Sequence, residues 1–484
     1  MIEALGTLNL AVALHLLAQI GAAIRVLARP DKPPAVRAGW LVLIFSVPVA
    51  GVVLYLLVGE TRLNFRIAQR QRKTLAALPP PRARHRFDPP PEAWRAAFAR
   101  AASVNGYAIS HACAPRLLVP AQDQIASLIE DIEAASDSVH IISYIWLDDP
   151  VGRALAEALI RAAKRGVEVC LLVDGLGART FLRAPHWQAM RAAGVQTSVA
   201  FPFHWALFKL ATSRIDLRNH RKLAVIDARI AYIGSRNIAA PEFKIKARFA
   251  PWTDILLRLE GPIVAQHAHI FATDWMTHTG RALAAESDAP ETHVTPSPIP
   301  ALGAPAICFA SGPMLDARAI PDVFDAAIGA ARDSLTLTTP YFVPGEGLDA
   351  ALRAAARRGV VVRLIVPRRN DSRFVALASR SYYPALIAAG VQIYEHGPGI
   401  LHAKTLLADD HALILGSANL DRRSYELNYE ACVLMSDPAL ARDLAAAQDG
   451  WLEHSVRIDS DSLAQWSLAR RLANNLVSIL APVL

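Results

Sequence analysis

Two segments of the chain carry the same chemically active residue types at the same spacing. The first is NHRKLAVIDARIAYIGSRN, residues 219–237, and the second is LHAKTLLADDHALILGSAN, residues 401–419. An imidazole, an ammonium, a hydroxyl and an amide together suit a phosphate group. The lysine neutralises its charge, the hydroxyl and the amide donate to its oxygens, and the histidine can attack phosphorus or transfer a proton. The shared residues are His220, Lys222, Asp227, Ser235 and Asn237 in the first segment and His402, Lys404, Asp409, Ser417 and Asn419 in the second.

The spacing within each segment predicts a β-hairpin that gathers the polar residues on one face. Residues two apart on a strand point to the same side, as His220 and Lys222 do in the first segment. The hairpin would place His220 opposite Asn237 and Lys222 opposite Ser235, and the second segment predicts the equivalent pairs. The aspartate of each segment falls near the turn, on the other side, where a carboxylate is expected to fix the loop.

A single active site built from both segments is the hypothesis that follows. Displacement at a phosphodiester needs a nucleophile on one side of phosphorus and an acid on the side of the leaving group. Two facing histidines supply both, because imidazole has an ordinary pKa of ~6.5 and can take either state near neutral pH. A metal site is a weaker alternative, since the lysine in each segment would repel a cation. One segment alone would be interpreted as a solvated hairpin, but two identical spacings favour a functional site.

Two acidic residues are candidates for orienting the histidines. Asp254 and Glu430 stand at similar distances after the two segments, each within an apolar run typical of a strand. A carboxylate bonded to one ring nitrogen of a histidine biases its tautomer and its charge. The alternative interpretation is a structural ion pair with Arg258 or Arg423.

The elements around the two segments repeat as well. Each half shows a buried strand, an amphipathic helix ending at glycine and a second strand, and AAGVQ occurs at 192–196 and 388–392. Alternating strands and helices predict an α/β fold with a parallel or mixed sheet covered by helices. The predicted elements are 139–146, 152–166 and 167–175 in the first half and 335–342, 348–359 and 360–367 in the second.

The N-terminal region predicts a membrane hairpin. Residues 5–24 and 38–59 are apolar runs of about the length that crosses a ~30 Å hydrocarbon layer, and Pro48 is expected to kink the second helix. A cleaved signal peptide is the alternative for the first run, but only Glu3 stands where a basic region belongs. Arginines and lysines flank the second helix on both sides, so the sequence leaves the orientation open.

Proline-rich stretches divide the rest of the chain. PPPRARHRFDPPP begins at residue 79 and predicts a semi-rigid spacer, and a second proline-rich break starts at residue 289. The last residues form an amphipathic pattern that suits a helix lying on the bilayer or one docked on the body. The predicted domains are a membrane hairpin (1–60), a basic and proline-rich linker (61–108), a first α/β repeat (109–288), an inter-repeat linker (289–305) and a second α/β repeat with a C-terminal amphipathic segment (306–484).

Composition limits the partners and the metal chemistry. The 484 residues carry a net charge of +8, which favours anionic partners such as nucleic acid, acidic membrane lipid or a phosphate-bearing substrate. The four cysteines are widely separated and have no CxxC spacing, so a disulfide framework or a zinc site built on them is not expected. The sequence does not fix the oligomeric state.

Both segments match the HxKxxxxD signatures of the phospholipase D superfamily: HRKLAVID followed by GSRN, and HAKTLLAD followed by GSAN. More narrowly, the chain resembles the bacterial cardiolipin synthases from the membrane hairpin to the C-terminus. The motifs that carry this resemblance are PVAGVVLYLLVGE, RNHRK, LEGPIV, TTPYFVP, RRNDS and NLDRRSYELNYE.

The resemblance implies two phospholipase D-like repeats related by a pseudo-twofold axis. It implies that one phosphatidylglycerol gives its phosphatidyl group to a histidine and that a second phosphatidylglycerol accepts it, which forms cardiolipin and glycerol. His220 would be the nucleophile and His402 the general acid and base, although the residues alone permit the reverse. Lys222, Lys404, Asn237 and Asn419 would hold the phosphate, with help from Ser235 and Ser417. The implied setting is the bacterial inner membrane with anionic lipid as partner, without nucleic acid, metal or nucleotide cofactor.

Three other functions compete with this expectation. A phospholipase D-type hydrolase, or another phosphatidyltransferase, would use the same site with water or a different alcohol as acceptor. A nuclease of the superfamily is disfavoured by the membrane hairpin. A scaffold that binds anionic lipid without turnover is disfavoured because both polar segments are intact.

Overall fold

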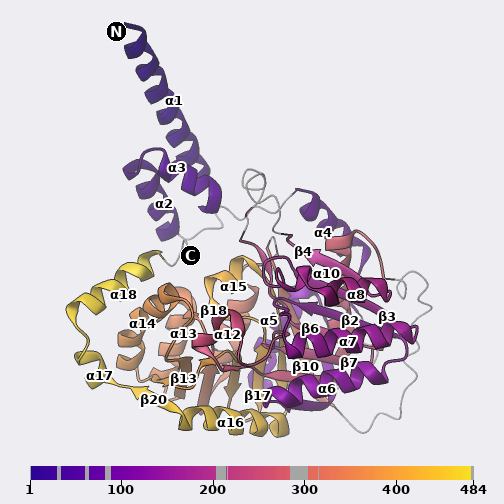
Figure 1. The fold of residues 1–484 in the computed structure, drawn as a ribbon. Coiled ribbons are helices and arrows are strands. Elements are labelled where there is room, and N and C mark those ends of the chain that lie inside the picture. The colour runs from indigo at the N-terminus through magenta and orange to yellow at the C-terminus, as the bar shows by residue number, and fades with distance from the viewer. Residues whose placement is uncertain are drawn as a thin grey trace.

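A large mixed β-sheet forms the centre of the protein, and helices cover its faces (Figure 1). The computed structural model describes residues 2–29, 34–59, 65–81, 89–202, 214, 216–283, 303–313 and 315–480. The strands of the first half are β1 (Ser110–Leu118), β2 (Ser138–Ser143), β3 (Glu168–Asp174), β4 (Gln196–Ala200), β6 (Leu223–Ile226), β7 (Ile230–Gly234) and β9 (Leu256–Glu260). Those of the second are β10 (Ala304–Ser311), β11 (Ser334–Thr338), β13 (Val361–Pro367), β14 (Gln392–His396), β16 (Thr405–Ala408), β17 (Ala412–Gly416), β19 (Asn428–Ser436) and β20 (Ser455–Ile458).

The order of the strands is the same in both halves. The first runs β4-β3-β2-β6-β7-β9-β1 and the second β14-β13-β11-β16-β17-β19-β10, and the pairing of β1 with β10 joins them into one sheet. The fully buried side chains of Leu257, Phe309 and Val433 belong to one hydrophobic cluster, so the halves also share a core. The predicted pair of related α/β halves is therefore confirmed.

The helices of each half pack beside the strands that they connect. They are α6 (Ala121–Ala134), α7 (Pro150–Lys164), η3 (Phe181–Arg183), α8 (Pro185–Ala192) and α10 (Val264–Thr279) in the first half, and α12 (Ala319–Ala330), α13 (Gly345–Arg357), α14 (Arg373–Ala388) and α16 (Pro438–Glu453) in the second. Helix α7 shows why such segments are helical. Asp149 caps its N-terminus by accepting from the Gly152 amide at 2.9 Å, and Leu155 and Leu159, one turn apart, are fully buried.

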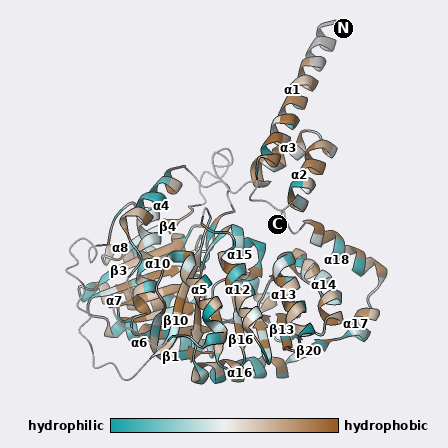
Figure 2. Ribbon diagram, turned by 180° about the vertical axis from the view of Figure 1, so that it is seen from behind, coloured by the Kyte–Doolittle hydropathy of each residue, from teal (hydrophilic) through white to brown (hydrophobic). Residues whose placement is uncertain are grey.

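The N-terminal region differs from the predicted pair of spanning helices. Helix α1 (Ile2–Leu27) contains one window, Leu10–Leu27, that is long and apolar enough to cross a membrane. The second apolar run is broken at Pro48 into α2 (Pro34–Ser46), α3 (Ala50–Leu54) and the π-helix η1 (Tyr55–Gly59). Helix α3 folds against α2 so closely that a Cβ on Gly51 would lie 2.3 Å from the Leu43 carbonyl oxygen. In Figure 2 most of the described residues of these helices have the colour of hydrophobic residues, and the helices project away from the body.

The region predicted as a linker, 61–108, contains two helices that pack on the body. Helix α4 (Phe65–Ala77) lies against α10, and the Tyr429 hydroxyl donates to Gln71 of α4 at 3.1 Å. Helix α5 (Arg95–Asn105), after the short η2 (Glu92–Trp94), packs on α12 and β10. The first proline-rich break lies partly, and the second mostly, outside the described residues.

The C-terminal segment forms the docked helix that its sequence allowed as one alternative, and its contact with a bilayer stays a prediction. After α17 (Ser460–Ala464), helix α18 (Leu468–Leu480) packs one side on α14. Its other side exposes an apolar row in which the exposed fraction of each side chain is at least 60%, consisting of Leu468, Leu472, Leu476 and Ile479. This row is of the kind that contacts the surface of a bilayer.

Candidate active site

The two predicted hairpins exist, but their register differs from the prediction by one residue. Leu223 of β6 pairs with Ile233 of β7, where the predicted register required Gly234, and β16 and β17 show the same shift. The reason is the turn, in which two successive non-glycine residues adopt positive φ, Asp227 (50°) and Ala228 (49°). The histidines, lysines, serines and asparagines of the motifs lie outside the paired residues of these hairpins. Their side chains therefore need not all point to one face.

The two motif aspartates hold loops and do not contact the pocket. Asp227 accepts hydrogen bonds from the backbone amides of Ser136, Asp137 and Ser138 at 2.8 to 2.9 Å, at the start of β2. Asp409 binds the amides of residues 332–334 in the same way. Their place among the catalytic residues of the motif is therefore corrected: they fix the hairpin turns, as their position on the opposite side predicted.

Each histidine is oriented by the carboxylate of the other repeat. His220 Nδ1 lies 2.9 Å from Glu430, and His402 Nδ1 lies 2.6 Å from Asp254. A carboxylate accepts the Nδ1 proton and leaves Nε2 free to act on a substrate. Both acidic residues thus occupy the orienting positions predicted for them, and each works across the boundary between the halves.

Short strands hold this crossed arrangement in place. Strand β5 (Arg218–Asn219) pairs in parallel with β19, and β8 (Trp252–Thr253) with β15 (Ile400–Leu401). The His220 amide donates to the Tyr429 carbonyl at 2.9 Å, and the His402 amide donates to the Thr253 carbonyl at 2.7 Å. A second pair, β12 (Phe342–Val343) with β18 (Leu420–Asp421), precedes the short helix α15 (Arg422–Glu426).

The two serines support the carboxylates and do not face the pocket. Ser235 donates to Asp254 at 2.7 Å, and Ser417 donates to Glu430 at 2.5 Å, and both serines are fully buried. Their predicted contact with a substrate phosphate stays a prediction that these contacts do not support. Their hydroxyls help to keep two buried carboxylates ionised, because a hydrogen bond to the charged form favours it.

The two lysines lie directly behind the histidines. Lys222 Nζ donates to the His220 carbonyl at 2.7 Å and Lys404 Nζ to the His402 carbonyl at 2.5 Å. Neither side chain lines the pocket. Burial lowers the pKa of Lys222 to about 8 and that of Lys404 to about 7. The lysines therefore supply positive charge close to neutral pH without occupying the space of a substrate.

Burial also sets the charge of the histidines. It lowers the pKa of both His220 and His402 to about 4, against the opposing effect of the carboxylates. Burial acts to raise the pKa of Asp254 and Glu430 too, but the histidines and lysines hold the pKa of both below its ordinary value. Both lysines contribute to the lowered pKa of both histidines, which shows that the two motifs converge on one electrostatic environment.

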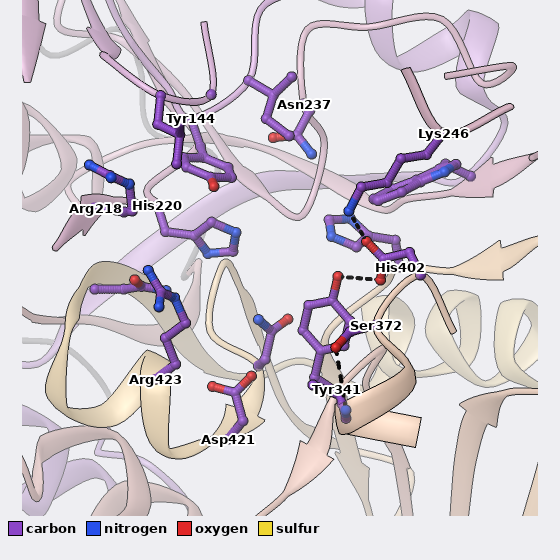
Figure 3. A pocket seen from close by; sticks show the side chains of 18 of the residues that line it. Tyr144, Arg218, His220, Asn237, Lys246, Tyr341, Ser372, His402, Asp421 and Arg423 are labelled. Carbon is purple, nitrogen blue, oxygen red and sulfur yellow. Dashed lines mark hydrogen bonds and ion pairs between the residues drawn. The ribbon is translucent and has the colours of Figure 1, made fainter. Parts of the chain in front are cut away.

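A pocket of about 520 Å³ brings the two motifs together (Figure 3). His220 and His402 line it from opposite sides. Asn237 and Asn419 also line it, and the amide oxygen of each is buried without a hydrogen-bond partner among the described residues. The arrangement suits a phosphorus atom between two imidazoles with its oxygens beside two amides.

Several pocket residues were not predicted from the sequence. Tyr144 packs on the ring of His220 with 4.7 Å between ring centroids, and Trp252 packs on His402 at 4.8 Å. Arg218 and Arg423 line the pocket beside His220. Tyr144 lies within the predicted strand 139–146, just after the observed end of β2 at Ser143, and Trp252 stands two residues before Asp254. An aromatic residue close to a predicted strand end or to a predicted orienting carboxylate was the only feature of the sequence that could have indicated these two pocket residues.

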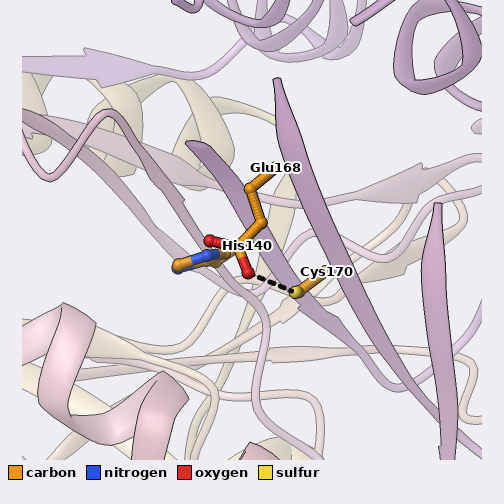
Figure 4. Close-up of side chains that lie close together, drawn as sticks. All are labelled: His140, Glu168 and Cys170. Carbon is orange, nitrogen blue, oxygen red and sulfur yellow. Dashed lines mark hydrogen bonds between the residues drawn. The ribbon is translucent and has the colours of Figure 1, made fainter. Parts of the chain in front are cut away.

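One group of metal-ligating side chains lies elsewhere in the described part of the chain. His140, Glu168 and Cys170 on β2 and β3 have ligand atoms within 4.8 Å of one another (Figure 4). The thiol of Cys170 lies 3.9 Å from Glu168, and burial raises its pKa, which opposes the thiolate that a metal requires. His140 stacks on Phe271 at 4.7 Å. These contacts explain the group as part of the core.

Comparison with known proteins agrees with the geometry. Residues 128–275 and 324–450 match the family described as cardiolipin synthase, phospholipase D-like domain, and residues 17–60 match a phospholipase D-nuclease N-terminal family. Cardiolipin synthase A of Salmonella arizonae is 35% identical over 477 residues, which is 96% of both chains. The chain belongs to the cardiolipin synthase family. The enzyme of the same name from Salmonella paratyphi B is 34% identical with equal coverage.

A solved structure shows the same fold outside the cardiolipin synthase family. Phosphatidylserine synthase of Haemophilus influenzae superimposes with a TM-score of 0.57 and covers 80% of this chain and 97% of its own. Its sequence identity of 14% supports the fold alone. As a member of the cardiolipin synthase family, the chain is a phosphatidyltransferase of the phospholipase D type with a membrane-associated N-terminal region.

Proposed function

We propose that this protein transfers a phosphatidyl group from one phosphatidylglycerol to another, which forms cardiolipin and releases glycerol. The observation that carries the proposal is the pair of imidazoles from the two repeats, which line opposite sides of one pocket and are each held by a carboxylate at Nδ1. A neutral Nε2 on one side and a protonated Nε2 on the other are what displacement at a phosphodiester requires.

The reaction proceeds in two steps at the same phosphorus atom. In the first, Nε2 of one histidine attacks phosphorus while the other histidine gives its proton to the departing glycerol. In the second, the hydroxyl of another phosphatidylglycerol attacks phosphorus, its proton passes to the second histidine, and the phosphorus–nitrogen bond breaks. The negative phosphate also raises the pKa of a nearby imidazole, so bound substrate favours the protonated partner that the first step needs.

The surroundings of the phosphorus fit an anionic centre. Asn237 and Asn419 are placed to donate from their amide nitrogens to the non-bridging oxygens. Lys222 and Lys404 supply charge from behind the pocket wall. We propose phosphate binding for these four residues and a supporting role for Ser235 and Ser417 through the carboxylates.

The pocket wall favours lipid over water. Its lining is predominantly apolar and includes Phe243, Ile245, Val343 and Phe374, of which Ile245 and Phe374 are more than half exposed at the surface. Apolar walls suit acyl chains and exclude water, and exclusion of water protects the phosphorus–nitrogen bond from hydrolysis. This feature favours a synthase over a hydrolase that uses the same site.

The N-terminal helices suit attachment to the bacterial inner membrane, where phosphatidylglycerol is supplied by the bilayer itself. We propose that α1 spans the membrane and that α2, α3 and η1 enter the same bilayer. Exposed fractions of 62% for Leu10, 64% for Leu17 and 65% for Val42 support this placement, because such surfaces are unfavourable in water.

Mass spectrometry of phosphatidylglycerol vesicles incubated with the purified full-length protein tests the function. Cardiolipin and free glycerol in equal amounts are expected, together with loss of both products in His220→Ala and His402→Ala. Phosphatidic acid without cardiolipin would identify a hydrolase. Circular dichroism of the two variants should match that of the wild-type protein, which separates lost chemistry from lost folding.

A further inference from the structure

The two ends of the pocket differ although the catalytic residues are repeated. Arg218 stands two residues before His220, whereas Ile400 stands two residues before His402. Arg423 stands four residues after Asn419, whereas Pro241 stands four residues after Asn237. At these two pairs of equivalent positions arginine is present only on the His220 side, so the internal symmetry is broken close to the two histidines.

The two arginines reach the pocket from adjacent segments of different repeats. Arg218 pairs with Asn428 across β5 and β19, and Arg423 donates to the Asp216 carbonyl two residues before Arg218. Tyr144 lies between this end and His220: its ring contacts His220, and both guanidinium groups act to lower the pKa of its phenol, which burial raises. Figure 3 shows Arg218, Arg423 and Tyr144 around His220.

Both arginines at this end lie near carboxylates. Arg218 lies 4.0 Å from Asp174, and Arg423 lies 3.9 Å from Asp216. Asp216 is already bound by Arg214 through two hydrogen bonds of 2.6 and 2.7 Å. Arg423 also acts on the carboxylate of Asp421, which lines the pocket beside it, and the exposed Arg179 is a further cation of the pocket lining. Two guanidinium groups that line the same end of a pocket are suited to an anion.

The end beside His402 has a different character. Trp252 packs on His402 and Phe243 stacks on Trp252 at 4.1 Å. The only lysine that lines the described pocket, Lys246 of η4 (Lys244–Phe249), forms an ion pair with Asp371. This end is apolar and close to neutral, which suits acyl chains better than a second phosphate.

We propose that Arg218, Arg423 and the Tyr144 hydroxyl form a subsite for the phosphate of the accepting phospholipid. The inference rests on the proposed phosphatidyl transfer and specifies its second substrate. An accepting phosphatidylglycerol carries a phosphate one glycerol unit away from its reactive hydroxyl. With that phosphate at the arginines, the glycerol passes Tyr144 and its hydroxyl reaches phosphorus from the side of His220. Guanidinium groups suit this task because they bind phosphate oxygens in a fixed, paired geometry.

This placement assigns the roles of the two histidines. His402 Nε2 attacks the first lipid and forms the phosphorus–nitrogen bond, while His220 gives its proton to the departing glycerol oxygen. The hydroxyl of the second lipid then forms the new phosphorus–oxygen bond, its proton goes to His220 Nε2, and the electron pair of the broken phosphorus–nitrogen bond returns to His402. The roles are thus the reverse of those that the family resemblance implies.

Two soluble acceptors that differ by one phosphate test the subsite. Full-length protein in mixed micelles of phosphatidylglycerol and detergent is given isotopically labelled glycerol or labelled glycerol phosphate, and the labelled phospholipids are measured. In the wild-type protein kcat/KM for glycerol phosphate should exceed that for glycerol at least tenfold. Arg423→Gln should remove most of this preference and reduce cardiolipin formation at least tenfold, with glycerol exchange within twofold of wild type.

Matched variants exclude trivial explanations. Arg423→Lys should restore part of the preference for glycerol phosphate, because it returns a positive charge without the paired geometry. Arg318→Gln, which removes an exposed arginine at the N-cap of α12 that does not line the pocket, should behave as wild type. Equal loss of glycerol exchange and cardiolipin formation in Arg423→Gln, or an unchanged preference for glycerol phosphate, would overturn the subsite. Absence of glycerol exchange in the wild-type protein would instead refute the proposed phosphatidyl transfer.

Discussion

Glu430 of the second repeat binds Nδ1 of His220 of the first at 2.9 Å, and Asp254 of the first repeat binds Nδ1 of His402 of the second at 2.6 Å. Each repeat thus supplies a histidine that it cannot orient by itself. The active site is complete only when both halves are docked, although each half contains a full copy of the motif.

Replacing Glu430 by Gln should slow cardiolipin formation by about 10- to 100-fold or more, because an amide neither fixes the histidine tautomer nor stabilises imidazolium. The rate of product formation at saturating phosphatidylglycerol measures the effect. At the other histidine the matched variant is Asp254→Asn, because asparagine keeps the length of the aspartate side chain. A rate near that of wild type in both variants would show that the crossed carboxylates are only structural.

The two histidines should respond differently to a donor whose leaving group needs no proton. With a phosphatidyl ester of p-nitrophenol, His220→Ala should still release one equivalent of p-nitrophenolate per site, whereas His402→Ala should release none. The reason is that an activated leaving group replaces the acid but cannot replace the nucleophile. Absorbance in a rapid-mixing experiment measures the burst. A burst in His402→Ala and none in His220→Ala would assign the nucleophile to His220.

The affinity for phosphatidylglycerol should fall above neutral pH. The pKa of Lys404 is lowered to about 7 and that of Lys222 to about 8, so their positive charges are present below these values and are lost as the pH rises through them. The apparent KM should therefore rise by up to about tenfold per pH unit above pH 8. Initial rates at a series of phosphatidylglycerol concentrations between pH 6.5 and 9.5 give the apparent KM at each pH. The slope of log KM against pH is then compared with the prediction.

Lys404→Met provides the control for this pH dependence. It should have a KM that is already raised at pH 7 and that changes less steeply with pH, because one of the two titrating charges is missing. A KM of the wild-type protein that stays constant up to pH 9.5 would contradict a contribution of the lysines to phosphate binding.

Asp227→Ala should lower stability more than chemistry. The substitution leaves three backbone amides of residues 136–138 without their acceptor, at a cost of about 1 to 3 kcal/mol in the free energy of unfolding. Urea unfolding of the purified protein measures the loss, and the turnover rate below the transition should stay within about twofold of wild type. A large loss of turnover at unchanged stability would return this aspartate to the catalytic residues.

The sequence predicted the residues of the site better than their contacts. The repeated residue types and spacing made it possible to predict the histidines, the asparagines and both orienting carboxylates, and all of them lie at the site. The hairpin register was missed because Asp227 and Ala228 both adopt positive φ, which non-glycine residues rarely do. The contacts of Ser235 and Ser417 could not be predicted, since they depend on which carboxylate lies behind each hairpin.

The fold shows the same division between local pattern and tertiary context. Strand and helix periodicity predicted two α/β halves, but not their union in one sheet through β1 and β10. The crossed carboxylates require knowledge of how β5 meets β19 and how β8 meets β15, which local sequence does not contain. Hydropathy indicated a second spanning helix at residues 38–59, whereas the break at Pro48 divides this run into shorter segments.

Two contacts tie the membrane-proximal part of the chain to the catalytic body. Arg214 donates to the Val58 carbonyl at 2.7 Å, and Gln71 accepts from Tyr429, whose carbonyl holds the backbone of His220. The catalytic body is therefore attached to the N-terminal region by direct hydrogen bonds as well as by the connecting chain. With α1 in a bilayer, as proposed, these contacts would hold the mouth of the pocket close to the lipid headgroups, so that a lipid substrate could enter without passing through water.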